Sequence, residues 1–240
     1  MFHSHVELQY NVRIAGVIIN KVIPDKFEQT RKYMGKAMMK AWGVPLLGVI
    51  PDRPFLGMPA LRDMEHLFKT ELISGTEHRL RHYSTSDINV VTTNLTRFLE
   101  NLREKPRRTL YICHVTRDDL IVGFLGEYQR RREKTEQPFE AALIICGRRG
   151  KYQLSSEVND MLHGSSGAPV MVVGFSTHDA MKKIHNFTPK LNIDDTNRVV
   201  VAAEHYEPYI DFDELMRRTQ SGNSSFNEPG SITLEELRRL

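Results

Sequence analysis

Three polar or turn-forming residues follow directly after predicted buried strands, the place where α/β proteins bind their ligands. Asn20 and Lys21 follow the apolar run 13–19, and Pro51 follows the run 45–50. Ligands of open α/β sheets lie at the carboxyl ends of strands. An Asn amide donates and accepts hydrogen bonds at once, which suits the edge of a purine base. These residues predict a nucleotide-binding site or, alternatively, a capped turn beside the proline that ends a strand.

Three further clusters of polar residues follow the predicted strands 109–113, 141–147 and 169–174. They are His114, Thr116, Arg117 and Asp119, then Gly147, Arg148 and Arg149, and then Ser176 and Thr177. If the strands are parallel, all three clusters converge on one edge of the sheet. Arg117 near a helix N-terminus predicts an anion or ligand site, aided by backbone N–H groups. A structural pair between Arg117 and Asp119 is the equal alternative.

Serine-protease and zinc chemistry are both disfavoured by their local context. Residues 164–169 read GSSGAP, but the protease loop belongs to an all-β fold, and the G-x-S-x-G elbow is incomplete. His78 and His82 stand four apart in EHRLRH, which places the glutamate wrongly for a metalloprotease. We therefore assign no catalytic residue and no metal ligand.

Composition is that of an ordinary globular protein. The 240 residues are 40% apolar and 26% charged, and the net charge of +3 is too small to indicate nucleic acid or an acidic membrane as partner. Cys113 and Cys146 lie in separate apolar runs without a CxxC motif, which favours a reducing compartment. The first ten residues lack the apolar core of a signal peptide, and no apolar run is long enough to span a membrane. We expect a cytoplasmic protein.

Short apolar runs alternate with amphipathic ones, which predicts an α/β fold with three layers and mainly parallel sheets. Strands are predicted at 13–19, 45–50, 109–113, 141–147 and 169–174, and helices at 24–42, 61–68, 86–102, 118–131, 155–162, 176–185, 194–205 and 211–219. The tail 220–240 is rich in Ser, Asn and Gly and is expected to be disordered, with a docking helix at 233–240 as the alternative.

The order of these segments resembles the N-terminal regulatory half of long phosphate acetyltransferases. GVIINKV at 16–22, a helix, and then GVPLLGVIPDRPFL resemble the second half of a dethiobiotin-synthetase-like P-loop domain. The stretch from 71 to 185 resembles a DRTGG domain, and TPKL through YIDFDEL at 188–215 resembles the segment that closes that half. The resemblance implies a partial P-loop-like lobe at 1–70, a DRTGG-like domain at 71–187, closing helices at 188–219 and a tail at 220–240.

This chain departs from the family at the motifs that carry chemistry. No G-x-x-x-x-G-K-[ST] motif occurs, so the phosphates of Mg-ATP would not be positioned for hydrolysis. The family's Asp-Arg-x-Asp aligns with residues 116–119, its Thr-Gly-Gly with 146–148 and its Asp-Thr with 176–177, so two carboxylates, one threonine and one glycine are lost. The acetyltransferase domain that would follow is not in the sequence. In the dethiobiotin-synthetase-like family, the Asn that matches Asn20 contacts adenine.

The resemblance implies a non-catalytic regulatory or interaction module that requires no cofactor and has ATP or another adenine nucleotide as its possible ligand. Its nucleotide site would comprise Asn20, Lys21 and Pro51, and the DRTGG-like site would comprise Arg117, Asp119, Gly147 and Thr177. A lobe that lacks several strands leaves one flank of its sheet open, which predicts a homo-oligomer or a partner protein. The alternative is an ATP-binding protein or an acetyltransferase- or P-loop ATPase-related enzyme, with this chain a truncated product of a longer gene.

Overall fold

The computed structural model describes residues 14–104, 108–134, 138–147, 153–163 and 167–220. The chain forms an α/β structure with mostly parallel strands, which confirms the predicted fold class. It divides into two compact units: unit 1 combines Met1–Leu56 with Leu191–Leu240, and unit 2 is Gly57–Lys190. The 191–220 helices therefore belong with the first strands, and the 61–68 helix belongs to unit 2.

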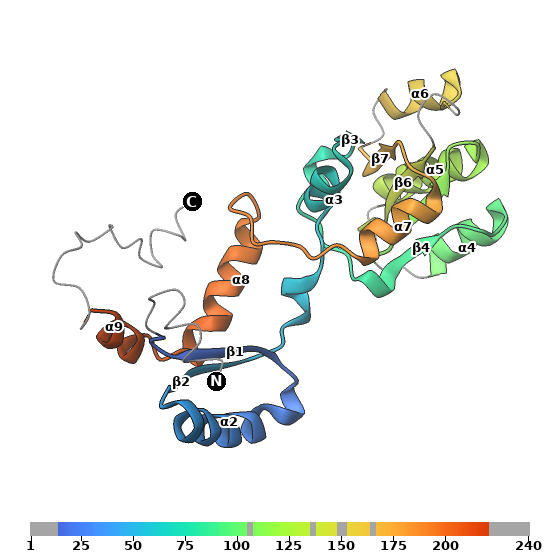
Figure 1. Cartoon of the computed structure of the whole chain (residues 1–240). Helices are drawn as coiled ribbons and strands as arrows, with labels where there is room; N and C mark the ends of the chain where they lie inside the picture. The colour runs from blue at the N-terminus through green and yellow to red at the C-terminus, as the bar shows by residue number, and fades with distance from the viewer. Residues whose placement is uncertain (1–13, 105–107, 135–137, 148–152, 164–166, 221–240) are drawn as a thin grey trace. The chain divides into compact units, whose positions relative to one another are not determined.

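Unit 2 is built on a five-stranded sheet in the order β3-β7-β6-β5-β4 (Figure 1). The strands are β3 (Leu72–Ser74), β4 (Ile88–Val90), β5 (Leu110–His114), β6 (Ala142–Cys146) and β7 (Val170–Val173). The last four strands are parallel to one another, and β3 pairs with β7 in the antiparallel sense. Parallel strands need helical crossovers, which agrees with the alternating pattern of the sequence.

Helices cover both faces of this sheet, so unit 2 has three layers. One core holds side chains of α4 (Leu95–Glu104), α5 (Asp118–Lys134) and α6 (Ser156–His163). The other core holds those of α3 (Leu61–Phe68) and α7 (Thr177–His185). Successive strand residues alternate between the two cores, as the two-residue period of a strand requires. This double covering explains why the central strands read as continuous apolar runs.

The predicted helix 86–102 is wrong in its first half. Residues Thr85–Asp87 form a short 3-10 turn, Ile88–Val90 form the edge strand β4, and α4 begins only at Leu95. The Asn94 side chain accepts a hydrogen bond from the Arg97 backbone N–H (3.0 Å) and caps the helix there. The apolar positions 88, 91 and 95 fit a helical spacing, but the run INVV is rich in β-branched residues, which favours a strand.

Unit 1 contains a two-stranded parallel sheet of β1 (Val17–Val22) and β2 (Leu46–Pro51). Helix α2 (Phe27–Trp42) joins the strands and ends at Gly43, whose φ of 65° needs the left-handed conformation that glycine adopts freely. Helices α8 (Thr196–Tyr206) and α9 (Phe212–Gln220) complete the unit. Figure 1 shows α2 and α8 on opposite sides of the strands.

The segment between α8 and α9 protects the outer edge of β2. Ile210 forms an antiparallel bridge with Gly48, and the Asp211 N–H donates to the Leu47 carbonyl (2.8 Å). Gly48 permits this approach, because a Cβ there would lie 2.7 Å from the Tyr209 carbonyl oxygen. Among the described residues, β1 has no such neighbour on its other edge.

One buried carboxylate ties α4 to α5 in unit 2. Glu127 accepts hydrogen bonds from Arg103 (3.1 Å), Arg130 (2.9 Å) and Arg131 (3.3 Å), and Arg131 also donates to the Leu102 carbonyl. Burial acts to raise the Glu127 pKa, but the hydrogen bonds from these three guanidinium groups outweigh it and lower the pKa to about 2.

We predict that Gly48→Ala destabilises unit 1 by about 1–3 kcal/mol, because the new Cβ meets the backbone of Tyr209. Gly35→Ala is the matched control: it lies inside α2 with its nearest neighbour, Leu46, at 3.7 Å, and should add up to about 1 kcal/mol of stability. Urea unfolding followed by the fluorescence of Trp42, the single tryptophan, reports on unit 1. Equal effects of the two substitutions would contradict the close approach at Gly48.

We predict that Glu127→Gln lowers the free energy of unfolding at pH 7 by about 1–3 kcal/mol. The folded-state pKa lies near 2, below the unfolded value near 4.5, so the carboxylate stabilises the fold above pH 4.5 and loses its effect as the pH falls toward 2. Urea unfolding followed by circular dichroism should therefore show a smaller difference between wild type and variant at pH 3. A difference that is independent of pH would contradict this assignment.

Candidate functional site

The carboxyl ends of β5, β6 and β7 lie along one edge of the unit 2 sheet. His114 is in register with Cys146, and Cys146 with Val173. Each strand is followed at this edge by one of the predicted clusters, which brings Arg117, Gly147 and Thr177 to the same side of the sheet. The predicted Arg148 and Arg149 lie outside the described residues.

A crevice opens at this edge between β6 and β7. The chain leaves β6 toward α6 on one face of the sheet and leaves β7 toward α7 on the other face. Ligand crevices form where neighbouring connections diverge in this way. The hollow has a volume of about 430 Å³ and is lined by Phe68, Lys69, Thr70, Gly147, Val172, Val173, Gly174 and Phe175.

The crevice offers one cation and an aromatic wall. Lys69 lines it, Phe175 stands in its wall, and Lys183 Nζ lies 4.9 Å from the centre of the Phe175 ring. Gly147 contributes only backbone, and its N–H is already bonded to the Val173 carbonyl (3.1 Å). The site can accommodate a small, flat ligand with a negative charge. Lys69 and Phe175 are not among the residues predicted from the sequence, because no local pattern shows that the end of α3 lies at this edge of the sheet.

Arg117 and Asp119 form an ion pair with two hydrogen bonds. Arg117 donates from Nε (2.9 Å) and Nη2 (2.8 Å) to the carboxylate, and Nη2 also donates to the Thr93 carbonyl (3.2 Å). Hydrogen bonding to Arg117 lowers the Asp119 pKa and raises that of Arg117. The pair thus links the start of α5 to the β4–α4 turn. An anion at Arg117 would compete with Asp119.

Thr177 and Ser176 lie at the beginning of α7. Ser176 Oγ accepts from the Asp179 N–H (3.1 Å) and donates to the Asp179 carboxylate (2.6 Å), so it is the N-cap and Thr177 is the first helical residue. His114 Nδ1 lies 2.8 Å from Thr116 Oγ1. Both contacts are local and hold the polar groups of this edge in place.

The predicted nucleotide residues of unit 1 lie together at the end of β1. Val22 pairs with Pro51, and Asn20 and Lys21 form a bulge opposite Ile50 in which Lys21 has a positive φ of 59°. The Lys21 N–H donates to Asn20 Oδ1 (2.7 Å), the local hydrogen bond that the turn interpretation expects. Adenine binding by Asn20 stays a prediction.

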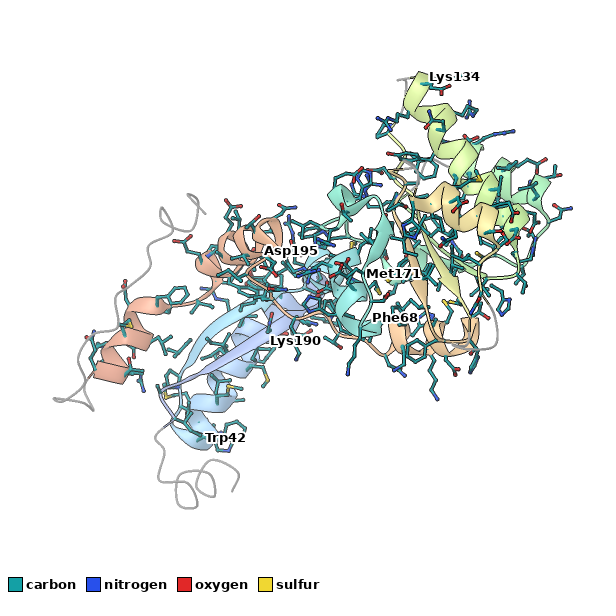
Figure 2. The ribbon with its side chains drawn as sticks, turned by 90° about the horizontal axis from the view of Figure 1, so that it is seen from above. Trp42, Phe68, Lys134, Met171, Lys190 and Asp195 are labelled. Carbon is teal, nitrogen blue, oxygen red and sulfur yellow. The ribbon has the colours of Figure 1, made fainter. Side chains whose placement is uncertain are left out.

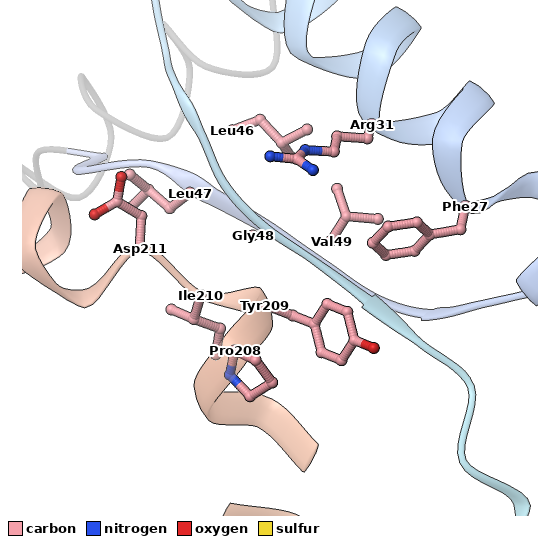
Figure 3. Close-up of a pocket in the computed structure, with 10 residues that line it drawn as sticks. All are labelled: Phe27, Arg31, Leu46, Leu47, Gly48, Val49, Pro208, Tyr209, Ile210 and Asp211. Carbon is pink, nitrogen blue, oxygen red and sulfur yellow. The ribbon is translucent and has the colours of Figure 1, made fainter. Parts of the chain in front are cut away.

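A hollow of about 300 Å³ lies beside β2, and the sequence did not predict it. Figure 3 shows the residues that line it. Its walls come from α2 and from residues 208–211, and the Phe27 and Tyr209 rings meet edge to face at 5.6 Å. The Arg31 side chain extends over β2 at its rim. Residues 27 and 209 are far apart in the sequence, so no local pattern could have paired them.

Metal and thiol chemistry find no support in the part of the chain that the structure describes. Within it, no group of three or more His, Cys, Asp or Glu residues is placed to hold a metal ion. Cys113 and Cys146 are unpaired and buried, they face opposite cores, and burial raises the pKa of each thiol to about 12. Among the described helices, none is long and apolar enough to cross a membrane.

Comparison of the chain with family models, with curated proteins and with solved structures found no significant match.

We predict that the Arg117–Asp119 pair contributes less than about 1 kcal/mol to stability, because both side chains are partly exposed to water. A double-mutant cycle with Arg117→Gln and Asp119→Asn, read by urea unfolding, measures this coupling. A coupling above about 2 kcal/mol would show that the pair is a main structural element of this edge.

Proposed function

We propose that this protein is a non-catalytic regulatory module that associates with a second copy of itself through unit 1. The observation that carries the proposal is the open edge of β1. Segment 209–211 lies beside β2, whereas β1 has no second neighbour within the described ranges. An unpaired strand edge presents N–H and C=O groups that another strand can bind.

The segment 17–42 of unit 1 also exposes several large apolar side chains, most of them on α2. Helix α2 carries apolar residues over a wider arc than two strands can cover, and only Met38 among its residues is buried. The exposed large apolar residues of this region are Ile18, Ile23, Tyr33, Met34, Met39 and Trp42. Trp42 extends from the end of α2 (Figure 2). A group of exposed apolar side chains of this kind indicates an interaction surface.

A second copy of the chain would pair with the open edge of β1 and would also cover exposed apolar side chains of α2. Two identical edge strands related by a two-fold axis pair in the antiparallel sense, which would give a continuous four-stranded sheet in the order β2-β1-β1-β2. The same axis brings the two α2 helices to the same face of that sheet, side by side. The bulge at Asn20 and Lys21 limits the pairing to the first half of β1, because a bulge interrupts the regular ladder.

The resemblance to the regulatory half of phosphate acetyltransferases supports a regulatory role for this association and a cytosolic setting. Nucleotide sensing is a second candidate function, and the crevice between Gly147 and Gly174 favours it. An adenine nucleotide that binds one oligomeric state more tightly than the other would shift the equilibrium between them. Neither of these two candidate functions requires the chain to catalyse a reaction.

We predict that the purified chain forms a concentration-dependent dimer in sedimentation velocity, and that Ile18→Arg weakens it at least about tenfold. Each dimer buries this change twice in a two-fold interface. Val122→Arg is the matched control, because Val122 and Ile18 are both 40% exposed and Val122 lies on α5 in unit 2. Circular dichroism must show that both variants fold.

A chain that stays monomeric at all concentrations, or a dimer that both variants weaken equally, would contradict association through β1. Repeating the measurement with ADP present separates the two candidate functions. If ADP shifts the dimer equilibrium and Lys69→Gln abolishes that shift, the protein both associates and senses nucleotides. If ADP leaves the equilibrium unchanged, the result supports association without nucleotide sensing.

A further inference from the structure

A second hollow in unit 2 lies at the opposite edge of the sheet, beside the amino ends of the parallel strands. It has a volume of about 400 Å³ and is lined by His78, Arg81, Tyr128, Arg131, Arg132, Pro138 and Phe139. These residues come from the turn after β3, from the second half of α5 and from the approach to β6. Figure 2 labels Lys134 at the end of the same helix. The residues that face α5 here are distant from it in the chain, so no local pattern of the sequence marks this hollow.

Arg81 is held at this hollow by neutral partners. Its Nη1 donates to the Phe139 carbonyl (2.8 Å), and its Nη2 lies 2.9 Å from His78 Nδ1. Arginine can only donate, so Nδ1 accepts and the imidazole is neutral. Burial and the charge of Arg81 lower the His78 pKa, which agrees with this assignment. The guanidinium group is therefore fixed in position while its charge is not neutralised by either partner.

The other arginines of the hollow add to this excess of positive charge. Arg131 shares the single carboxylate of Glu127 with Arg103 and Arg130, so three cations face one anion. Arg132 is exposed at the rim and, like Arg81, has no carboxylate within ion-pair distance in the described part of the chain. Besides Glu127, whose carboxylate lies 3.3 Å from Arg131 Nε, Glu77 adjoins the hollow with its carboxylate 3.6 Å from His78 Nε2.

Aromatic rings form the apolar wall of the hollow. Tyr128 and Phe139 meet edge to face at 5.3 Å, and the Arg131 guanidinium lies 5.9 Å from the centre of the Phe139 ring. Guanidinium groups bind phosphate oxygens through parallel hydrogen bonds, and flat rings accept a base or another planar group. Charge and shape together match an anion with more than one negative charge.

We propose that this hollow binds a small ligand through a phosphate or pyrophosphate group, held by Arg81, Arg131 and Arg132. The site lies at the edge of the sheet opposite to the Gly147 crevice and in a different unit from the open edge of β1. It therefore does not depend on the proposed association.

Isothermal titration of the full chain with inorganic pyrophosphate tests the site. We expect saturable binding with a dissociation constant below about 1 mM, and a rise of about tenfold in Arg132→Gln, because each charge-assisted hydrogen bond that is lost weakens binding by roughly this factor. Arg81→Gln should weaken binding at least as much. Because Arg132 is exposed, its replacement leaves the fold intact. The Arg132→Gln variant therefore still tests the site if the Arg81→Gln variant fails to fold.

Lys182→Gln is the matched control, because it removes one exposed positive charge from α7 on the other face of the sheet. Its binding should equal that of the wild type. Equal weakening by Lys182→Gln would indicate a general charge effect and overturn the proposal, as would the lack of saturable binding up to about 10 mM. ADP in place of pyrophosphate distinguishes the two sources of the group: tighter binding of ADP indicates a nucleotide-like ligand against the rings, and equal binding indicates the inorganic anion.

Discussion

An apolar strand must be covered on both of its faces and paired along its edges, and the two units of this chain meet that requirement differently. In unit 2, helices cover both faces of the sheet, and every residue of the central strands β5 and β6 is buried except His114 at the end of β5. In unit 1, two strands carry a helix whose apolar surface is wider than the sheet, and β1 stays open among the described residues. Unit 2 therefore covers its central strands with its own helices, whereas in unit 1 the proposed association would pair the open edge of β1.

The places available for ligands follow from the same arrangement. Because four of the five strands of unit 2 are parallel, their amino ends lie at one edge of the sheet and their carboxyl ends at the opposite edge. The carboxyl edge holds the crevice at Gly147, and the amino edge holds the arginine-lined hollow at Arg81. A regulatory module needs a ligand that distinguishes two states of the protein. Binding in unit 2 and association in unit 1 are the two events that such a regulation would have to couple.

Strong local signals allowed much of the fold to be predicted. The helix over Leu61–Phe68 and the end of α2 at Gly43 were predicted as observed, because apolar periodicity and a left-handed glycine are local features. The short strands β3 and β4 were missed, since each gains its stability from the neighbouring strand. The sequence predicted that Arg117, Gly147 and Thr177 lie at one edge of the sheet, because the strands before them are parallel. It could not predict Lys69, Phe175 and Arg81 as lining residues, because contacts between distant segments place them there.

Hydrogen–deuterium exchange of the β1 amides across a range of protein concentrations tests the central claim most directly. The Val17 N–H already donates to the Pro45 carbonyl (3.0 Å), and successive N–H groups of a strand point to opposite edges, so the Ile18 N–H faces the open edge. If β1 pairs with a second copy, the Ile18 amide becomes protected as the dimer forms, while the amides of β5 stay protected throughout. Fast exchange of the Ile18 amide at concentrations where the chain is dimeric would contradict the account, because the dimer would then be formed by another surface.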